Sequence, residues 1–342
     1  MQTGETKPVE ALIDALKAEG LRALPVFVSS LKDAVSVETL RSIFAEAPPA
    51  VVINATGFAV SAPGAERVST VLDEGGAVVE GVFPGVKQPC ALIGIAEKGL
   101  MDVQFVIEGA GGHASSPPSH TGIGRLARAV TRIEAMPFPA TLTKPVAEMF
   151  DTLGRRSSFA YKLIFANLWC FLPVLDAMCK KAGGELNAMM RTTCAFTMAE
   201  GSNASNVLPP RARMVANLRI ISGDTCESTV ERLKRLVADD GIQTSIIHGT
   251  DPCNISRTQG YGWEKLTHAI AETWPEAEVS PYLMFAASDS RHYAAISENV
   301  YRFSTMELTK EERAGIHGHD EHIPLEKIVK TVQFYVRLMR TL

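Results

Sequence analysis

The stretch DVQFVIEGAGGHASSPPSHTGIGRLARAVTRIEA (102–135) decides the fold. It opens with alternating polar and apolar side chains, which is typical of a half-buried β-strand. After a turn rich in Gly, Ser and Pro, residues 121–135 place apolar side chains at helical spacing, and Thr121 is a suitable N-cap. The stretch therefore predicts a strand followed by an amphipathic helix.

The elements that follow complete a known motif. Two strands, a helix and a last strand are predicted at RTTCAFTMAEG (191–201), ARMVANLRI (212–220), 225–238 and QTSIIHG (243–249). With residues 137–190 set aside, the order is β-α-β-β-α-β, the ferredoxin-like arrangement. Residues 137–190 then form a mostly helical insertion into this small domain.

The insertion contains the most apolar stretch of the chain, SFAYKLIFANLWCFLPVLDAM (158–178). A membrane span needs roughly 20 apolar residues with few polar breaks. Lys162, Asn167, Pro173 and Asp176 interrupt this stretch, which favours a buried or interface helix pair over a span. We therefore expect no membrane partner.

Both flanks of the small domain have an α/β rhythm. Strands are predicted at VLDEGGAVVEG (71–81), ending in an acidic Gly-rich turn, and at CALIGIAEKG (90–99). Helices and strands alternate again after residue 263, and Pro324 opens a long last helix. The N-terminal residues predict helix, strand, helix and strand at 8–19, 23–28, 36–46 and 50–55.

This pattern divides the chain into an α/β domain interrupted by a smaller α+β domain. The predicted parts are an N-terminal α/β segment, 1–66; a discontinuous α/β domain, 67–101 with 253–342; and the small domain, 102–252, with its insertion at 137–190.

The bulk composition narrows the class of partner and compartment. The 342 residues are 46% apolar and 21% charged, as in a globular protein, and the net charge of -4 gives no reason to expect nucleic acid. The N-terminus has no apolar run of the kind found in signal peptides. The six cysteines form no C-x-x-C pair and suit a reducing compartment, so we expect a cytoplasmic protein.

The densest metal-capable cluster is the loop GIHGHDEHIP (315–324), which holds His317, His319, Asp320, Glu321 and His322. Imidazole and carboxylate are ligands that zinc takes. A solvated polar loop in front of the last helix is the alternative. The turn LDEGG (72–76) offers Asp73 or Glu74 as a further metal ligand, although acidic Gly-rich turns are common.

Three other sites carry side chains suited to substrate. His113 follows a strand in GGHASSPP (111–118), and the alternative is a turn histidine bonded to its own backbone. Asn206 and Arg219 lie before and near the end of one strand, where an amide and a guanidinium could bind a carboxylate. Turn chemistry and a surface arginine are the alternative. SDSRHY (288–293) offers Asp289, Arg291 and His292 at a helix start.

Taken in order, VLDEGG, AEKG, GHASSPP, SNVLPP, SDSRHY and IHGHDEHIP resemble the motifs of metallopeptidase family twenty. Its carboxypeptidase S and N-acyl-amino-acid hydrolase branch is the most similar, over about residues 73–342. The resemblance implies a zinc-peptidase-like catalytic domain interrupted by a lid, or dimerisation, domain. It also implies a homodimer formed through the lid, with a small peptide or an N-acyl amino acid as substrate.

The resemblance further implies two zinc ions and a bridging water that attacks an amide carbonyl, helped by a glutamate base. By position, Asp73 resembles a carboxylate ligand of one zinc and His317 the histidine ligand of the other. His113 resembles the lid histidine that reaches the partner subunit's active site and polarises the scissile carbonyl.

Three further residues are assigned to substrate by the same resemblance. Asn206 and Arg219 resemble lid residues that hold the substrate carboxylate, and Arg291 lies in a loop near the substrate.

The chain departs from the family ahead of Asp73. There the family has a His-x-Asp motif, a bridging aspartate and a Glu-Glu pair that includes the general base. Residues 1–72 contain no histidine and no Glu-Glu pair, and the pair at Glu311 and Glu312 stands elsewhere. We expect the general base to be absent, zinc binding to be doubtful and the N-terminal part of the catalytic domain to be incomplete.

Residues 8–66 instead resemble a piece of the large subunit of cobaltochelatase, which implies a fusion or an assembly chimera joined around residues 67–73. Three functions follow for the chain. The first is a hydrolase of amide bonds, impaired by the missing residues. The second is a non-catalytic remnant that dimerises or binds a carboxylate-bearing ligand. The third is a role in corrin synthesis.

Overall fold

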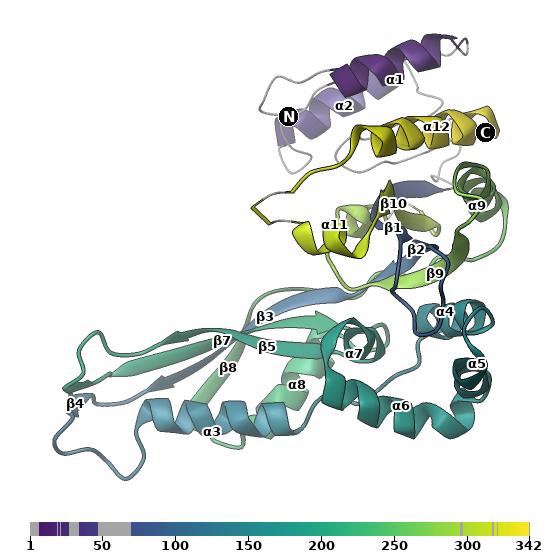
Figure 1. Cartoon of the computed structure of the whole chain (residues 1–342). Helices are drawn as coiled ribbons and strands as arrows, with labels where there is room; N and C mark the ends of the chain where they lie inside the picture. Colours follow the sequence, from purple (N-terminus) through teal and green to yellow (C-terminus); the bar gives the residue numbers. More distant parts are fainter. Residues whose placement is uncertain are drawn as a thin grey trace.

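The computed structural model describes residues 7–18, 20, 22–26, 34–46, 70–294, 297–316, 318–319 and 321–341. They form a core domain built on one mixed sheet and a long lid that projects from it (Figure 1). The α/β class and the interrupted arrangement predicted from the sequence are confirmed.

The core sheet has the strand order β1-β10-β2-β9. Its strands are β1 (Val71–Val79), β2 (Cys90–Glu97), β9 (Glu278–Met284) and β10 (Val300–Leu308). The β1–β10 and β2–β9 pairs are parallel, whereas β2 runs antiparallel to β10 and to the end of β1. The short helices α10 (Ser290–Tyr293) and α11 (Lys310–Gly315) flank β10.

Two helices bury a continuous apolar layer against this sheet. These helices are α9 (Tyr261–Thr273) and α12 (Leu325–Thr341). Trp274, Phe303 and Phe334 are fully buried between them and the strands, with ring centroids 5.7–6.1 Å apart. Burial of such large side chains is the main stabilising contribution to this layer.

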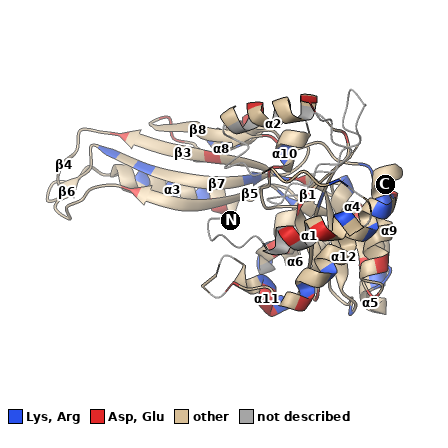
Figure 2. Cartoon of the chain, turned by 90° about the horizontal axis from the view of Figure 1, so that it is seen from above, with Lys and Arg blue, Asp and Glu red and all other residues tan. Residues whose placement is uncertain are grey.

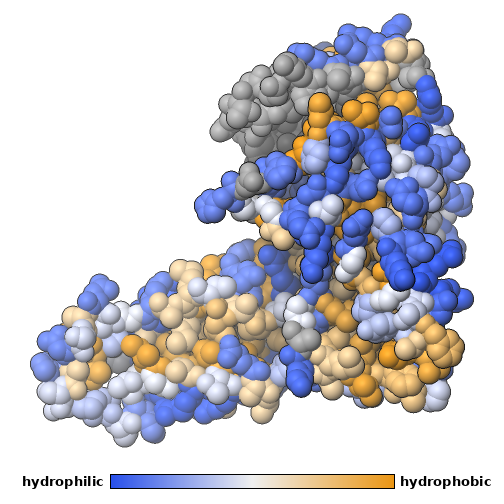
Figure 3. All heavy atoms as spheres, viewed as in Figure 1, coloured by the Kyte–Doolittle hydropathy of each residue, from blue (hydrophilic) through white to orange (hydrophobic). Residues whose placement is uncertain are grey.

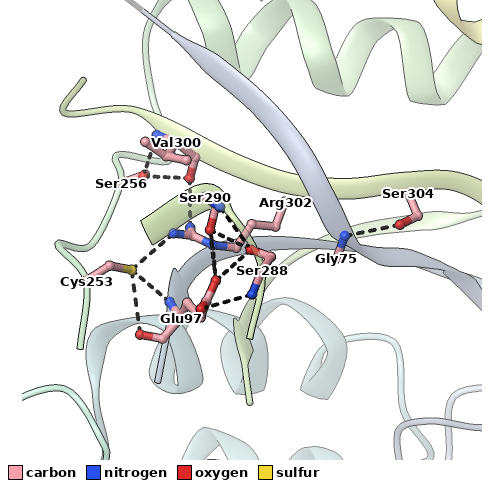
Figure 4. A network of polar contacts seen from close by, with 9 residues as sticks. All are labelled: Gly75, Glu97, Cys253, Ser256, Ser288, Ser290, Val300, Arg302 and Ser304. Atoms are coloured by element: carbon pink, nitrogen blue, oxygen red, sulfur yellow. Dashed lines mark hydrogen bonds and ion pairs between the residues drawn. The ribbon is translucent and has the colours of Figure 1, made fainter. Parts of the chain in front are cut away.

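The prediction of a turn at LDEGG is wrong, because β1 runs through these residues. The ladder with β10 shifts register on either side of Gly76, which marks a β-bulge. At the bulge the Gly75 N–H donates to Ser304 Oγ over 3.1 Å (Figure 4). A Cβ on Gly76 would lie 1.7 Å from Leu92 O, so the glycines here allow strands to approach closely rather than to turn.

The lid confirms the β-α-β-β-α-β order. Its elements are β3 (Gly99–Glu108), α3 (Gly122–Ala135), β5 (Thr193–Glu200), β7 (Arg211–Ile220), α8 (Cys226–Val237) and β8 (Ile242–Thr250). The strands form an antiparallel sheet in the order β5-β7-β3-β8, and α3 and α8 pack on one face through Leu126 and Leu233. Thr121 caps α3 as predicted, accepting from Gly124 N over 3.2 Å.

The far end of the lid is a short two-stranded sheet, seen at the free end of the arm in Figure 2. It is formed by β4 (Gly112–His113) and β6 (Val207–Leu208), which pair antiparallel. We call this two-stranded sheet the lid tip.

The insertion is helical, as predicted, and packs on the core sheet rather than on the lid sheet. It consists of α4 (Lys144–Gly154), α5 (Phe159–Ala166), α6 (Leu168–Ala182) and α7 (Gly184–Met190). Phe150, Phe165 and Leu175 are buried in one cluster with β1, β2 and β9 side chains. Among the described residues no single helix has the length and apolar composition of a membrane span, but α5 and α6, bent by 110°, meet those criteria together.

The N-terminal helices are confirmed as α1 (Lys7–Ala18) and α2 (Ala34–Glu46), with α1 against α12 (Figure 1). The strand predicted at 23–28 is wrong where it is described, because residues 22–26 are irregular. Leu24 and Val26 are exposed there, so the apolar run has no sheet to join. The strand predicted at 50–55 lies outside the described residues.

Candidate functional site

Asp73 is the most unusual acidic residue of the core domain. Its side chain is 1% exposed, and neither carboxylate oxygen has a hydrogen-bond partner among the described residues. Burial, and then repulsion by Glu74 and Asp289, raises its pKa from 3.8 to about 6. A buried carboxylate of this kind requires a proton or a cation to neutralise it.

Two more carboxylates lie near Asp73. Glu74 is exposed, and its pKa is also raised, by partial burial and by the charges of Asp289 and Glu97. Asp289 begins the turn that leads into α10. Arg302, the ladder partner of Asp73 on β10, offsets part of this negative charge and lowers the pKa of Asp73.

These residues do not complete a metal centre. No group of three or more His, Cys, Asp or Glu side chains among the described residues is placed to hold a metal ion. His317 and Asp320 lie outside the described residues, and His319 and His322 are exposed on the loop before α12. Asp73 has two buried oxygens without partners, as a metal ligand needs, but the described residues by themselves do not form a zinc site.

Arg302, which pairs with Asp73 in the β1–β10 ladder, belongs to a buried polar network that the sequence motifs do not predict (Figure 4). Glu97, at the end of β2, accepts from Ser288 Oγ over 2.7 Å, from Ser290 Oγ over 2.8 Å and from Ser288 N over 3.1 Å. Arg302 on β10 lies 3.4 Å from Glu97, donates to Ser290 Oγ over 2.6 Å, and is fully buried. This ion pair fixes the loop that carries Asp289 and Arg291.

Cys253 joins the same network from the other side. Its Sγ accepts from Glu97 N over 3.0 Å and from Arg302 Nη2 over 3.1 Å. Next to it, Lys98 donates from Nζ to Ala188 O and Arg191 O over 2.9 and 2.7 Å. Burial lowers the pKa of Lys98 to about 7. Lys98, at the junction between core domain and lid, is thus hydrogen-bonded to the end of the insertion.

Two of the predicted substrate residues lie at this junction. Arg291 lines a small cavity beside Lys98, Asp251 and Cys253. Arg219, near the end of β7, pairs with Leu100 in the ladder, and its Nη1 is buried without a partner among the described residues. A buried guanidinium N–H with no acceptor suits an anionic ligand.

The other two predicted residues lie together at the lid tip. His113 pairs with Val207 between β4 and β6, and Ala114 N donates to Asn206 O over 2.9 Å. Ser115 N donates to His113 Nδ1 over 3.2 Å, so the neutral ring carries its proton on Nε2. Both side chains are exposed, and the Nε2 proton is free to bind an acceptor.

The structure therefore separates the lid residues into two groups. Eight residue steps of β7 lie between Arg211, next to the tip, and Arg219, which is a distance of about 27 Å along an extended strand. Asn206 at the tip and Arg219 at the base of one lid are therefore too far apart to bind the same carboxylate.

Known proteins match both the lid and the N-terminal segment of this chain. Residues 95–245 match the Peptidase dimerisation domain, and residues 1–78 match CobN/Magnesium Chelatase. A probable carboxypeptidase S-like 2 from Dictyostelium discoideum is 34% identical over 79% of this chain and 52% of its own length. The N-fatty-acyl-amino acid synthase/hydrolase PM20D1 of Xenopus tropicalis is 35% identical over 80% of this chain and 54% of its own length.

Two further matches complete the comparison. The aerobic cobaltochelatase subunit CobN of a Sinorhizobium species is 71% identical over 25% of this chain and 7% of its own length. The solved structure of the di-peptidase Dug1p from Saccharomyces cerevisiae shares the fold, with 13% identity and a TM-score of 0.52 over 99% of this chain and 71% of its own.

The lid therefore matches the dimerisation domain of M20 peptidases, and the chain is similar to the carboxypeptidase S-like and PM20D1 branch of that family. Its N-terminal segment is similar to CobN. The chain spans about half the length of the curated relatives it matches.

Proposed function

We propose that this protein is a dimeric member of the M20 family that binds small peptides or N-acyl amino acids by their carboxylate and hydrolyses their amide bond poorly or not at all. The observation that supports it most strongly is the complete lid, with His113 and Asn206 at its tip and Arg219 at its base. The separation of these residues favours a site shared by two chains.

In the proposed complex the tip of one lid enters the site of its partner. The Nε2 proton of His113 binds the amide carbonyl, and the unpartnered Nη1 of Arg219 binds the ligand carboxylate in the other chain. Arg291 adds positive charge beside Arg219, and Asn206 enters with His113. Asp73 would be one ligand of a zinc ion, and such an ion would supply Lewis-acid activation of water.

Poor hydrolysis follows from the acids and bases available. Glu97 is buried and accepts from two serines and Arg302, so it is not free to act as a general base. Asp73 is the described carboxylate with the burial and free oxygens of a metal ligand. Loss of a general base alone costs roughly 10²–10⁴ in rate.

Light scattering and calorimetry test this proposal. The protein is expected to be a dimer at micromolar concentration and to bind N-lauroylphenylalanine or a dipeptide. R219M should weaken binding about tenfold or more, because a charge-assisted hydrogen bond is lost. R257M, in an exposed ion pair, is the matched control. A strict monomer, or equal binding by R219M and the unmodified protein, would contradict the proposal.

An active zinc hydrolase is the second candidate, and the unpartnered oxygens of Asp73 favour it. It predicts two zinc ions per chain by mass spectrometry of the metal content and turnover that a chelator abolishes. D73N should then remove both zinc and turnover. Chelatase activity is not proposed, because the matched segment spans 7% of that relative.

A further inference from the structure

The insertion presents a large apolar surface that the proposed site does not use. We call the outward side of α5 and α6 the insertion face; its main side chains are Phe159, Tyr161, Leu163, Trp169, Val174 and Met178. Phe159 is 81% and Trp169 85% exposed. Figure 3 shows the apolar side chains gathered over this end of the molecule.

Core packing does not account for this face. The opposite side of the same helices already fills the core, through Phe165, Leu175 and Cys179. A surface helix normally carries polar side chains on its outer side, whereas a helix that is apolar all round has an apolar partner on each side. The outer side of α6 from Leu168 to Met178 exposes no charged residue.

On α5 and α6, positively charged side chains outnumber negatively charged ones around the insertion face. Lys162, Lys180 and Lys181 are exposed on α5 and α6, and Asp176 is their acidic counterpart on these helices. Asp176 is engaged by Lys180 over 2.8 Å and by Arg191. The face is therefore locally positive on a molecule with a net charge of -4, which favours a negatively charged partner.

The shape of the insertion face fits a broad partner surface rather than a partner's groove. The two helices have 8 and 15 residues, roughly 12 and 22 Å, and are bent by 110°. Each is too short to cross a hydrocarbon core of about 30 Å. Exposed Trp and Tyr with flanking lysines suit the boundary between headgroups and acyl chains, where an amphipathic segment inserts by about 5–10 Å.

We propose that the insertion face docks on the surface of a bilayer that contains anionic phospholipid. Trp169 and Phe159 enter the acyl-chain boundary, and Lys162, Lys180 and Lys181 bind headgroup phosphates. The polar breaks in the sequence argue against a span, and docking on one leaflet does not require a span.

Co-sedimentation of the whole protein with vesicles tests this. Vesicles of phosphatidylcholine with about 30% phosphatidylserine should bind the protein more tightly than phosphatidylcholine alone, and salt should weaken binding. The double variant F159S/W169S should bind about tenfold more weakly or worse. L325S, at a residue 77% exposed on α12, is the matched control and should bind normally.

Fluorescence provides an independent measurement. Trp274 is buried and Trp263 packs on Tyr301, so a blue shift on vesicle binding reports Trp169 and should vanish in W169F. No binding to either vesicle, or binding unchanged by F159S/W169S, would overturn the proposal. Self-association that the double variant abolishes, without vesicle binding, would assign the face to a second copy of the chain and also overturn it.

Discussion

At the scale of single residues, Asp73 predicts an unusual pH dependence. The folded protein holds its proton up to about pH 6, whereas an unfolded aspartate releases it near 3.8. Between these values the folded state binds more protons, so the unfolding free energy falls as pH rises from about 4 to 6, by about 3 kcal/mol in total.

D73N removes this dependence. In the presence of a metal chelator, urea denaturation should give D73N a higher unfolding free energy than the unmodified protein at pH 7. This difference should shrink as the pH falls towards 4. A difference that does not change with pH would show that Asp73 has an ordinary pKa.

The pair of Glu97 and Arg302 gives a second prediction. R302M leaves a buried carboxylate without its charged partner and should cost about 3–5 kcal/mol in unfolding free energy. The double variant E97Q/R302M should recover part of that loss. R257M, in the exposed pair with Glu298, should cost less than about 1 kcal/mol. Equal losses in R302M and R257M would contradict this assignment.

The sequence predicted the residues at the site better than their partners. Motifs predict Asp73, His113 and Arg219, and the structure shows the environment of each, while their roles stay predictions. No motif predicts the role of Glu97 in AEKG, because its partner Arg302 lies 205 residues away and nothing local indicates that the two meet.

At the scale of elements, periodicity predicted the lid well. Its alternating strands and capped helices each carry a local signal, and Thr121 and Thr225 both act as caps. Predictions from sequence runs with an ambiguous signal were wrong. LDEGG has the composition of a turn, but its pairing with the distant strand β10 makes it part of β1. The apolar run at 23–26 has the composition of a strand, but it is irregular, with Leu24 and Val26 exposed.

The bulge in β1 gives the third prediction. G76A places a Cβ 1.7 Å from Leu92 O in a backbone that has little room to shift, and should cost more than about 4 kcal/mol or prevent folding. G109A is the control, since a Cβ there meets nothing within 4 Å. Thermal unfolding of the two variants checks this, and similar midpoints would contradict it.

At the scale of the whole molecule, α1 lies against α12, and Leu16 of α1 is buried. A chain that starts at residue 68 should therefore lose at least about 2 kcal/mol of unfolding free energy, the amount that burial of one leucine contributes. Chemical denaturation measures this loss, and an unchanged unfolding free energy would contradict the prediction.

The lid is joined to the rest of the chain at one end only. The chain passes between the two parts at Lys98, Thr143, Thr192 and Asp251, all at the base, whereas His113 is at the free tip. The lid is thus a cantilever about 27 Å long, and a rotation of about 5° at its root displaces the tip by about 2 Å. Resistance to bending at the base of the lid, to which the hydrogen bonds of Lys98 contribute, therefore controls how accurately the His113 imidazole is positioned.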